Sequence, residues 1–352
     1  MDAAILHEYG EPLNVRSVPA PEPGPNGAVV AVEACGLCRS DWHAWQGHGE
    51  WADDRVPRGQ ILGHEPAGRV VATGDAVDRV AVGQRVVVPF SLGDGSCWHC
   101  RNGHGNVCAD GWALGFEADA PGAFAEQVRV PAAEYNLVEL PAELSPRDAA
   151  VLGCRYMTAY HALADRAGLD GGEWLAVHGC GGVGLSAVQL GSALGARVIA
   201  VDPAADARDR AREIGADWVV DPDRTDPVAA IETHTGGGAD VSMDALGIAA
   251  TCRNSVRCLR ERGTHVQVGL TTDAERGSVR LPTDWMTRWE ISFVGARGMP
   301  PTRYDALFDL VAAAEIDPGA LIGRELALSE VSDRLAAMTD YETEGVEVLT
   351  TV

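Results

Sequence analysis

The 352-residue sequence predicts an α/β protein of two domains, one a barrel-like set of short strands and the other a doubly wound parallel sheet. Up to about residue 150, β-branched runs are separated by Gly and Pro, a pattern typical of short antiparallel strands. From about residue 173, apolar runs alternate with helix-like segments, a pattern typical of parallel strands joined by crossover helices. The hydrophobic content of 46% is sufficient for two cores.

Strands of the first domain are predicted at residues 28–32, 69–72 and 85–88, which are rich in Val. The glycines expected to break these runs are Gly27, Gly68, Gly74 and Gly83.

Strands of the second domain are predicted at residues 174–178, 197–201, 218–220, 241–243 and 264–268. A helix is expected from the glycine-rich loop after residue 178 to about Leu194. Nearer the C-terminus, the sequence predicts a helix over 304–314 and a final Val-rich strand.

The loop after residue 178 has the dinucleotide-binding fingerprint, with a strand before it and a helix after it. Gly179 permits a tight turn, Gly181 lets the backbone approach a pyrophosphate, and Gly184 lets the helix pack on the strand. The loop residues predicted to bind the cofactor are Gly179, Gly181, Gly182, Val183 and Gly184. This context favours a Rossmann nucleotide site over a merely structural turn.

Asp202 ends the next strand, at about the 20-residue spacing that the fingerprint requires. A carboxylate accepts hydrogen bonds from ribose hydroxyls and repels a 2′-phosphate, so the sequence predicts NAD as the cofactor. Arg208 is a further candidate for binding the cofactor, because it would reach a 2′-phosphate if the loop bends. NADP is therefore the alternative cofactor.

The net charge is −23, and all 28 basic residues are Arg, with no Lys in the sequence. Such a field repels nucleic acid and anionic membranes, and both classes of partner are excluded on this ground. The alternatives are an ordinary acidic enzyme or a protein adapted to molar salt, where charges are screened over roughly 3 Å. We favour the second, because acidic surfaces without lysine resemble those of salt-loving archaea.

No stretch approaches the roughly 18 apolar residues that a membrane helix needs, and the N-terminus lacks a secretory pattern. The nine cysteines are an odd number, so a disulfide framework is not predicted. We therefore expect a cytoplasmic protein.

Three separated residues, Cys38, His64 and Cys154, have side chains that bind metals. Two thiolates and one imidazole suit Zn²⁺ and leave a fourth coordination position for a substrate. A Lewis acid combined with a dinucleotide site indicates hydride transfer to or from a carbonyl.

With these motifs the chain resembles, nearly end to end, the zinc-dependent alcohol dehydrogenases of the medium-chain dehydrogenase/reductase superfamily. Its acidity resembles that of the haloarchaeal members of this family. The resemblance implies a GroES-like β-barrel catalytic domain over 1–153 and 297–352, and a Rossmann NAD-binding domain over 154–296. It also implies a homodimer or homotetramer that interconverts alcohols with aldehydes or ketones.

The resemblance assigns further catalytic roles near Cys38. Ser40 corresponds to the hydroxyl that hydrogen-bonds the substrate alcohol, and His43 to the histidine that passes the proton to solvent. The alternative for His43 is a surface histidine. Histidine titrates near neutral pH whereas a hydroxyl does not, so Ser40 would relay the proton and His43 exchange it.

Three more positions near the zinc ligands match the family. Asp41 resembles the carboxylate that orients the ligand His64, and Glu65 resembles the carboxylate behind the metal. Arg39 matches a position that contacts the cofactor pyrophosphate in some members. An exposed arginine is the alternative for Arg39.

A small lobe over residues 94–108 resembles the family's structural zinc site, which uses four cysteines with gaps of three, three and eight. The same gaps place Asp94 in the first position, and carboxylate is a legitimate zinc ligand. The expected ligands are Asp94, Cys97, Cys100 and Cys108. His99 and His104 compete for the fourth position, and a lobe without metal is a further alternative.

Phe90 lies where family members place an aromatic ring in the substrate pocket. The other aromatic residues expected in the core, at subunit contacts or in the pocket are Trp42, Trp45, Trp51, Trp112 and Phe116. These aromatic residues favour an apolar alcohol as the substrate. Cys154 favours it too, because similar polyol dehydrogenases more often have Glu at this position. A polyol or sugar dehydrogenase on the same scaffold is the alternative; a zinc-free reductase and a non-catalytic NAD-binding protein are more distant ones.

Overall fold

A computed structural model describes residues 1–48, 55–272, 274–343 and 345–351. The chain forms two compact units. Unit 1 contains residues 1–157, 298–308 and 317–352, and unit 2 contains residues 158–297 and 309–316. Trp51 lies outside the described residues.

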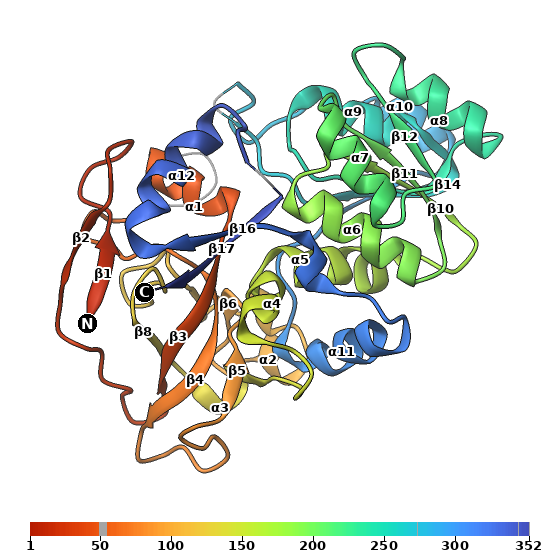
Figure 1. The fold of residues 1–352 in the computed structure, drawn as a ribbon. Helices are drawn as coiled ribbons and strands as arrows, with labels where there is room; N and C mark the ends of the chain where they lie inside the picture. The colour runs from red at the N-terminus through yellow and green to blue at the C-terminus, as the bar shows by residue number, and fades with distance from the viewer. Residues whose placement is uncertain (49–54, 273, 344, 352) are drawn as a thin grey trace. The chain divides into compact units, whose positions relative to one another are not determined.

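The main sheet of unit 1 has the strand order β16-β17-β3-β4-β5-β9, with β8 also paired to β3 (Figure 1). These strands are β3 (Ala28–Leu37), β4 (Glu65–Thr73), β5 (Arg85–Val87), β8 (Gln127–Val130), β9 (Val138–Glu139), β16 (Ile322–Ala327) and β17 (Val346–Thr351). The pairs among β3, β4, β5, β8 and β9 are antiparallel, as predicted. β16 and β17 are parallel to each other.

The C-terminal strand β17 completes this sheet by pairing antiparallel with β3. Glu347 lies opposite Leu37, so the last strand lies beside the residue that precedes Cys38. The sequence predicted the strand, but no local pattern identified its partner.

The expectation that Gly68 breaks a strand is wrong, because Gly68 lies inside β4. A Cβ at this position would lie 1.9 Å from the carbonyl oxygen of Ala31 on β3. Glycine is required here for the close approach of two backbones and not for a turn.

The core of unit 1 is formed by apolar side chains of these strands and of helix α12 (Val331–Thr339). Trp42 and Trp45 are buried in it, and Trp112 packs against it, so these rings are core residues. The remaining elements of unit 1 are short: β1 (Asp2–Ile5), β2 (Asn14–Ser17), α1 (Arg39–Gln46), β6 (Ser91–Leu92), α2 (Trp98–Arg101), η1 (Gly105–Val107), β7 (Trp112–Ala113), α3 (Ala133–Asn136), α4 (Pro146–Ala150), η2 (Val151–Gly153), η4 (Pro301–Arg303), η5 (Pro318–Leu321) and η6 (Leu328–Glu330).

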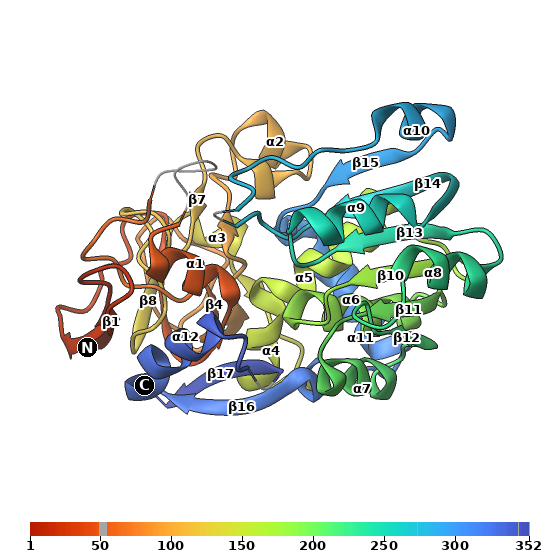
Figure 2. The same ribbon diagram turned by 90° about the horizontal axis from the view of Figure 1, so that it is seen from above.

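Unit 2 contains a six-stranded parallel sheet in the order β12-β11-β10-β13-β14-β15 (Figure 2), which confirms the predicted doubly wound fold. The strands are β10 (Trp174–His178), β11 (Arg197–Val201), β12 (Trp218–Val220), β13 (Ala239–Asp244), β14 (Leu259–Gln267) and β15 (Ser292–Gly295). The helices are α6 (Gly182–Ala193), α7 (Ala205–Glu213), α8 (Pro227–Thr235), α9 (Ala249–Arg257) and α10 (Thr283–Arg288).

The direction of winding reverses between β10 and β13. From β10 the chain proceeds outward to β11 and β12, then returns to place β13 on the other side of β10. Right-handed crossovers then put α6 and α7 on one face of the sheet and α8 and α9 on the other. The carboxyl ends of the strands at such a reversal are where doubly wound sheets bind ligands.

Helix α5 (Arg155–Tyr160) continues as a π-helical segment, η3 (His161–Ala167), and α11 covers Tyr304–Ala313. Within the described part of the chain, no helix combines the length and the apolar character that crossing a bilayer requires.

Candidate active site and second metal centre

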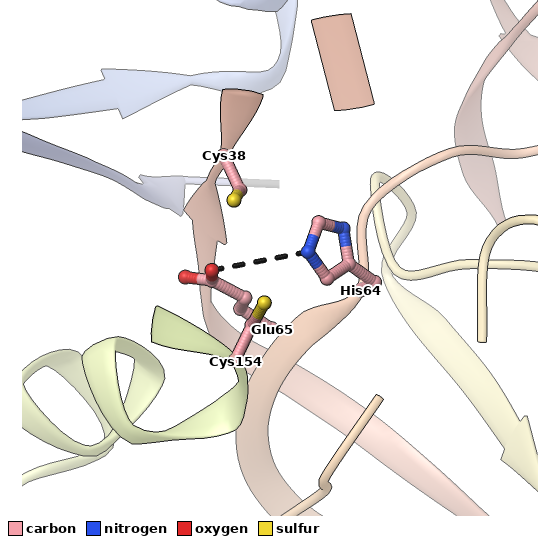
Figure 3. A group of neighbouring side chains, drawn as sticks. All are labelled: Cys38, His64, Glu65 and Cys154. Atoms are coloured by element: carbon pink, nitrogen blue, oxygen red, sulfur yellow. Dashed lines mark ion pairs between the residues drawn. The ribbon is translucent and has the colours of Figure 1, made fainter. Parts of the chain in front are cut away.

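The three predicted zinc ligands lie together in unit 1, with Glu65 beside them. Cys38 follows β3, His64 precedes β4, and Cys154 follows η2. A ligand atom from each of Cys38, His64, Glu65 and Cys154 lies within 4.8 Å of the others, and all four residues are buried. Figure 3 shows these four side chains turned toward one another.

The local backbone brings these segments together. β3 and β4 pair with Gly36 opposite Glu65, so Cys38 and His64 come from adjacent strand ends. Gly63 has φ +92°, and a Cβ there would lie 2.6 Å from the backbone nitrogen of Phe124. A side chain at this position would therefore displace the segment that carries His64.

Asp41 fixes the orientation of the imidazole. Its Oδ1 lies 2.9 Å from His64 Nδ1 and also accepts a bond from the Gly63 N–H at 3.0 Å. Its Oδ2 accepts a bond from the Cys38 N–H, also at 3.0 Å. Because the carboxylate oxygen accepts at Nδ1, a neutral His64 carries its proton there and presents its lone pair at Nε2. Nε2 is buried and has no hydrogen-bond partner among the described residues, as expected of an atom that binds a metal.

The two sulfur ligands are electrostatically coupled. The hydrogen bond with Cys154 is the main cause that lowers the pKa of the Cys38 thiol, and the same bond raises the pKa of Cys154. Zinc binds cysteine as the thiolate, and this arrangement favours the thiolate on Cys38. Two thiols, a free imidazole nitrogen and an adjacent carboxylate fit zinc well.

Glu65 forms a buried ion pair that the sequence did not predict. Its Oε2 lies 2.5 Å from Nη2 of Arg155. Burial raises the pKa of Glu65 to about 7, although the Arg155 charge opposes this shift. Its other oxygen, Oε1, lies 3.9 Å from His64 Nε2 and has no hydrogen-bond partner among the described residues. The one sequence signal for Arg155 was its position directly after Cys154.

The predicted proton-relay residues lie on α1. Ser40 Oγ lies 3.8 Å from Sγ of Cys38. His43 is half-buried, and its Nδ1 lies 3.0 Å from Nδ1 of His48, a residue to which the sequence gave no role. The structure thus places a hydroxyl beside a zinc ligand and an imidazole pair at the end of the same helix.

Two aromatic rings contact the ligand histidine. The Phe90 ring lies edge-on to His64 with centroids 5.7 Å apart, and the Phe116 ring lies closer, at 4.8 Å. Phe90 was predicted for the substrate pocket, whereas Phe116 was only one of several aromatic candidates. Both rings give this side of the site an apolar character.

Arg39 is held within unit 1 by aromatic rings. Its guanidinium lies 4.1 Å from the ring centroids of both Trp42 and Tyr341. It also donates a hydrogen bond to the carbonyl of Met338 at 2.6 Å. These contacts tie the start of α1 to the end of α12.

The second cluster contains Asp94, Cys97, Cys100 and Cys108, whose ligand atoms lie within 4.8 Å of one another. A hydrogen bond from Ser96 is the main cause that holds the pKa of the Asp94 carboxyl well below its usual range. The backbone N–H of Cys97 also donates to Asp94, at 3.0 Å. The cluster as described includes neither His99 nor His104, and His99 stacks edge-on against Trp98.

The glycine-rich loop of unit 2 connects β10 to α6. Gly179 has φ +95°, and a Cβ on Gly184 would lie 1.8 Å from the carbonyl oxygen of Gly179. A Cβ on Gly181 would meet no atom within 4 Å, so the space above this residue is open. Gly181 is the N-cap residue of α6, where the helix dipole favours an anion.

The Asp202 carboxylate and the Arg208 guanidinium do not pair with each other in the contacts described at the end of β11. Asp202 Oδ2 accepts a bond from the N–H of Cys180 in the glycine-rich loop at 2.8 Å. Arg208 donates to the carbonyls of Asp202 and Pro203, each at 2.7 Å, and its Nη2 lies 3.0 Å from Oδ2 of Asp221. Arg208 is therefore paired with a carboxylate.

Comparison with known proteins agrees with both units. Residues 24–142 match the family model for the alcohol dehydrogenase GroES-like domain, and residues 182–313 match that for zinc-binding dehydrogenases. The chain is 33% identical to an NAD-dependent alcohol dehydrogenase of Sulfurisphaera tokodaii, over 99% of both chains.

Solved structures show the same similarity. The alcohol dehydrogenase TADH from Thermus sp. ATN1 has a TM-score of 0.90 at 29% identity and covers 100% of both chains. A zinc-binding dehydrogenase from Sinorhizobium meliloti 1021 bound to NADP has a TM-score of 0.85 at 30% identity, over 99% of this chain and 98% of that one. The chain belongs to the zinc-binding alcohol dehydrogenases of the medium-chain family, with a GroES-like domain, a Rossmann-type sheet, and both a catalytic and a structural zinc site.

Proposed function

We propose that this enzyme interconverts apolar alcohols with their aldehydes or ketones and uses NAD as the hydride acceptor. The observation that carries the proposal is the buried set of Cys38, His64 and Cys154, in which His64 Nε2 has no hydrogen-bond partner among the described residues. Three protein ligands leave one position for the substrate oxygen, which a closed structural site would not.

When bound, zinc supplies a Lewis acid for the alcohol oxygen, and NAD supplies the hydride acceptor. Asp41 keeps His64 in the tautomer that presents Nε2. Ser40 would relay the proton, accepting that of the substrate hydroxyl while donating its own toward His43, and His43 would exchange it with solvent. Glu65 pairs with Arg155 behind the ligands, and Phe90 and Phe116 exclude water from the apolar part of the substrate.

The choice of NAD is supported by the partners of Asp202 and Arg208. The Asp202 carboxylate at the end of β11 would accept bonds from ribose hydroxyls and repel a 2′-phosphate. Arg208 is committed to Asp221 and to two backbone carbonyls, which makes it less available for that phosphate. The pyrophosphate would lie on the loop 179–184, and Arg39 is proposed as a further contact to it.

We further propose that Asp94 completes the structural zinc site with Cys97, Cys100 and Cys108. The three cysteines and this carboxylate form one cluster, and its hydrogen bonds keep Asp94 ionised and thus able to bind a cation. Two zinc ions per subunit are therefore expected.

On the scale of the whole protein, we propose a cytoplasmic homodimer or homotetramer adapted to high salt. The charge of −23 without any Lys supports the adaptation and also argues against nucleic-acid and membrane partners. The proposed catalytic domain is 1–153 with 297–352, and the proposed nucleotide domain is 154–296.

The test combines zinc analysis with turnover at molar KCl. Ethanol, benzyl alcohol and sorbitol are assayed with NAD and with NADP, for the wild type and for Cys38→Ser. We expect two zinc ions per wild-type subunit, one per Cys38→Ser subunit, and turnover of the apolar alcohols that this substitution abolishes. A preference for sorbitol would instead support the polyol alternative, and unchanged zinc content in Cys38→Ser would refute the catalytic site.

A further inference from the structure

Arg155 is a buried cation immediately after the zinc ligand Cys154, and only 5% of its surface is exposed. A buried arginine requires partners that compensate for the loss of water. The two partners found for it among the described residues belong to segments that carry the zinc ligands, and its Nε has no hydrogen-bond partner there.

The guanidinium contacts the covalent neighbours of the other two ligands. Nη1 donates to the carbonyl of Leu37, which precedes Cys38, at 3.1 Å. Nη2 donates to Oε2 of Glu65, which follows His64, at 2.5 Å. With its own peptide bond to Cys154, Arg155 thus connects the three chain segments that hold the metal ligands.

The surrounding backbone leaves room for this ion pair. Gly36 lies opposite Glu65 on the adjacent strand. A Cβ at Gly36 would lie 1.9 Å from Oε2 of Glu65 and 2.7 Å from Nη2 of Arg155. β3 therefore has no side chain at the one position where the carboxylate and guanidinium meet.

Arg155 is the cation that pairs with the buried carboxylate of Glu65. Lysine would supply the charge, but its single ammonium lacks the planar fork that reaches a carbonyl and a carboxylate together.

We propose that Arg155 is a positioning residue of the catalytic zinc site. It holds the Cys38, His64 and Cys154 segments at a common separation and keeps Glu65 Oε2 away from the metal. This inference rests on the proposed function only in that these three residues bind zinc.

The test measures zinc release from the holoenzyme to a chromogenic chelator. Cys38→Ser and Cys97→Ser each remove one ion and so assign the two phases of release to the two sites. In Arg155→Lys, which keeps the charge and loses the fork, we expect faster release from the catalytic site by roughly 10–100-fold, the usual effect of losing a residue that supports a metal ligand. Release from the structural site should be unchanged.

Arg334→Met is the matched control. Arg334, which is half-buried, forms an ion pair with the buried Glu347 in unit 1, with Nη2 2.6 Å from Oε1. Loss of this pair should lower the melting temperature and leave the ratio of the two release rates at its wild-type value.

The outcomes separate the possibilities. Wild-type release from the catalytic site in Arg155→Lys would overturn the proposal, and so would an equal acceleration at both sites, since that would indicate a loosened fold. If Arg155→Lys does not fold, zinc release is measured in Glu65→Gln instead, because this substitution weakens the same bond between Arg155 and Glu65. The proposal is then judged by the same two results: release from the catalytic site and its ratio to release from the structural site. A wild-type protein from which Cys38→Ser removes no zinc would show that the proposed function has failed, whatever the rates.

Discussion

Among the individual residues, Asp41 connects two of the predicted zinc ligands through three hydrogen bonds. Both of its carboxylate oxygens accept: Oδ1 from His64 Nδ1 and the Gly63 N–H, and Oδ2 from the Cys38 N–H. One side chain thus fixes a ligand imidazole and the backbone beside two ligands. Three accepted bonds also satisfy the carboxylate oxygens of a residue without an exposed surface.

Asp41→Asn should weaken zinc binding at the catalytic site by roughly 10–100-fold and lower kcat/KM with it. The reason is that the amide NH₂ would face an N–H donor on one side. Competition with a chelator of known affinity measures the change. Asp165→Asn is the control, because Asp165 makes the same kind of contact with Nδ1 of His161, at 2.8 Å, outside the metal sites. Equal zinc affinity in wild type and Asp41→Asn would contradict the role given to Asp41.

Asp202→Asn tests the basis of cofactor choice. The amide retains an oxygen for the Cys180 N–H and removes the charge that would repel a 2′-phosphate. The ratio of kcat/KM for NADP to that for NAD should rise about tenfold, which corresponds to about 1.4 kcal/mol. The exposed carboxylate of Asp209 on α7 provides the control substitution Asp209→Asn. If the ratio of kcat/KM for NADP to that for NAD is unchanged in Asp202→Asn, residues other than Asp202 determine the cofactor preference.

At the level of helices and strands, the local sequence predicted unit 2 best. The strands Trp174–His178, Arg197–Val201 and Trp218–Val220 have the predicted bounds, because each is an apolar run with polar or glycine residues at its ends. The glycine-rich loop also lies as predicted between β10 and α6.

What the sequence did not reveal depends on pairing between distant strands. Gly68 and Arg155 have their roles only because β3 lies against β4, with Gly36 opposite Glu65. Phe116 contacts His64 through a loop that no periodic pattern describes. The zinc ligands were predicted because a resemblance covers them, whereas the residues that support them follow from register and burial.

A buried histidine at the carboxyl end of β10 makes the stability of the fold depend on pH. His178 is buried there, with Nε2 3.5 Å from Sγ of Cys258, and burial lowers the pKa of His178 to about 3. Below pH 6.5 the unfolded chain binds a proton that the folded chain excludes, so acid favours unfolding. The free energy of unfolding should fall by about 1.4 kcal/mol for each pH unit between about 6.5 and 3 from this group alone.

Urea unfolding of wild type and His178→Asn at pH 7.5 and 5.5 measures this effect. The substitution should reduce the pH dependence, although burial also lowers the pKa of His265 and leaves a residual slope. His234→Asn, at an exposed position on α8, should keep the wild-type dependence. An identical slope in His178→Asn would show that His178 accepts a proton in the folded state.

For the whole molecule, the charge of −23 makes stability depend on the salt concentration of the solvent. Repulsion among surface carboxylates acts over roughly 10 Å at 0.1 M salt and roughly 3 Å at 1 M. We expect the melting temperature to fall steadily as KCl is lowered from molar to millimolar concentration. Sucrose at equal osmolality should not replace the salt, and a melting temperature that stays flat across the series would contradict adaptation to salt.

The pairing of β17 with β3 has a consequence for how the chain matures on the ribosome. Strand β17 is made after all of unit 2, yet it lies against the segment that leads into Cys38. All of unit 2 has been synthesised by then, so its sheet can form while the barrel of unit 1 still lacks a strand. A nascent chain stalled before Val346 would therefore present the segment that leads into Cys38 on an unpaired edge of β3.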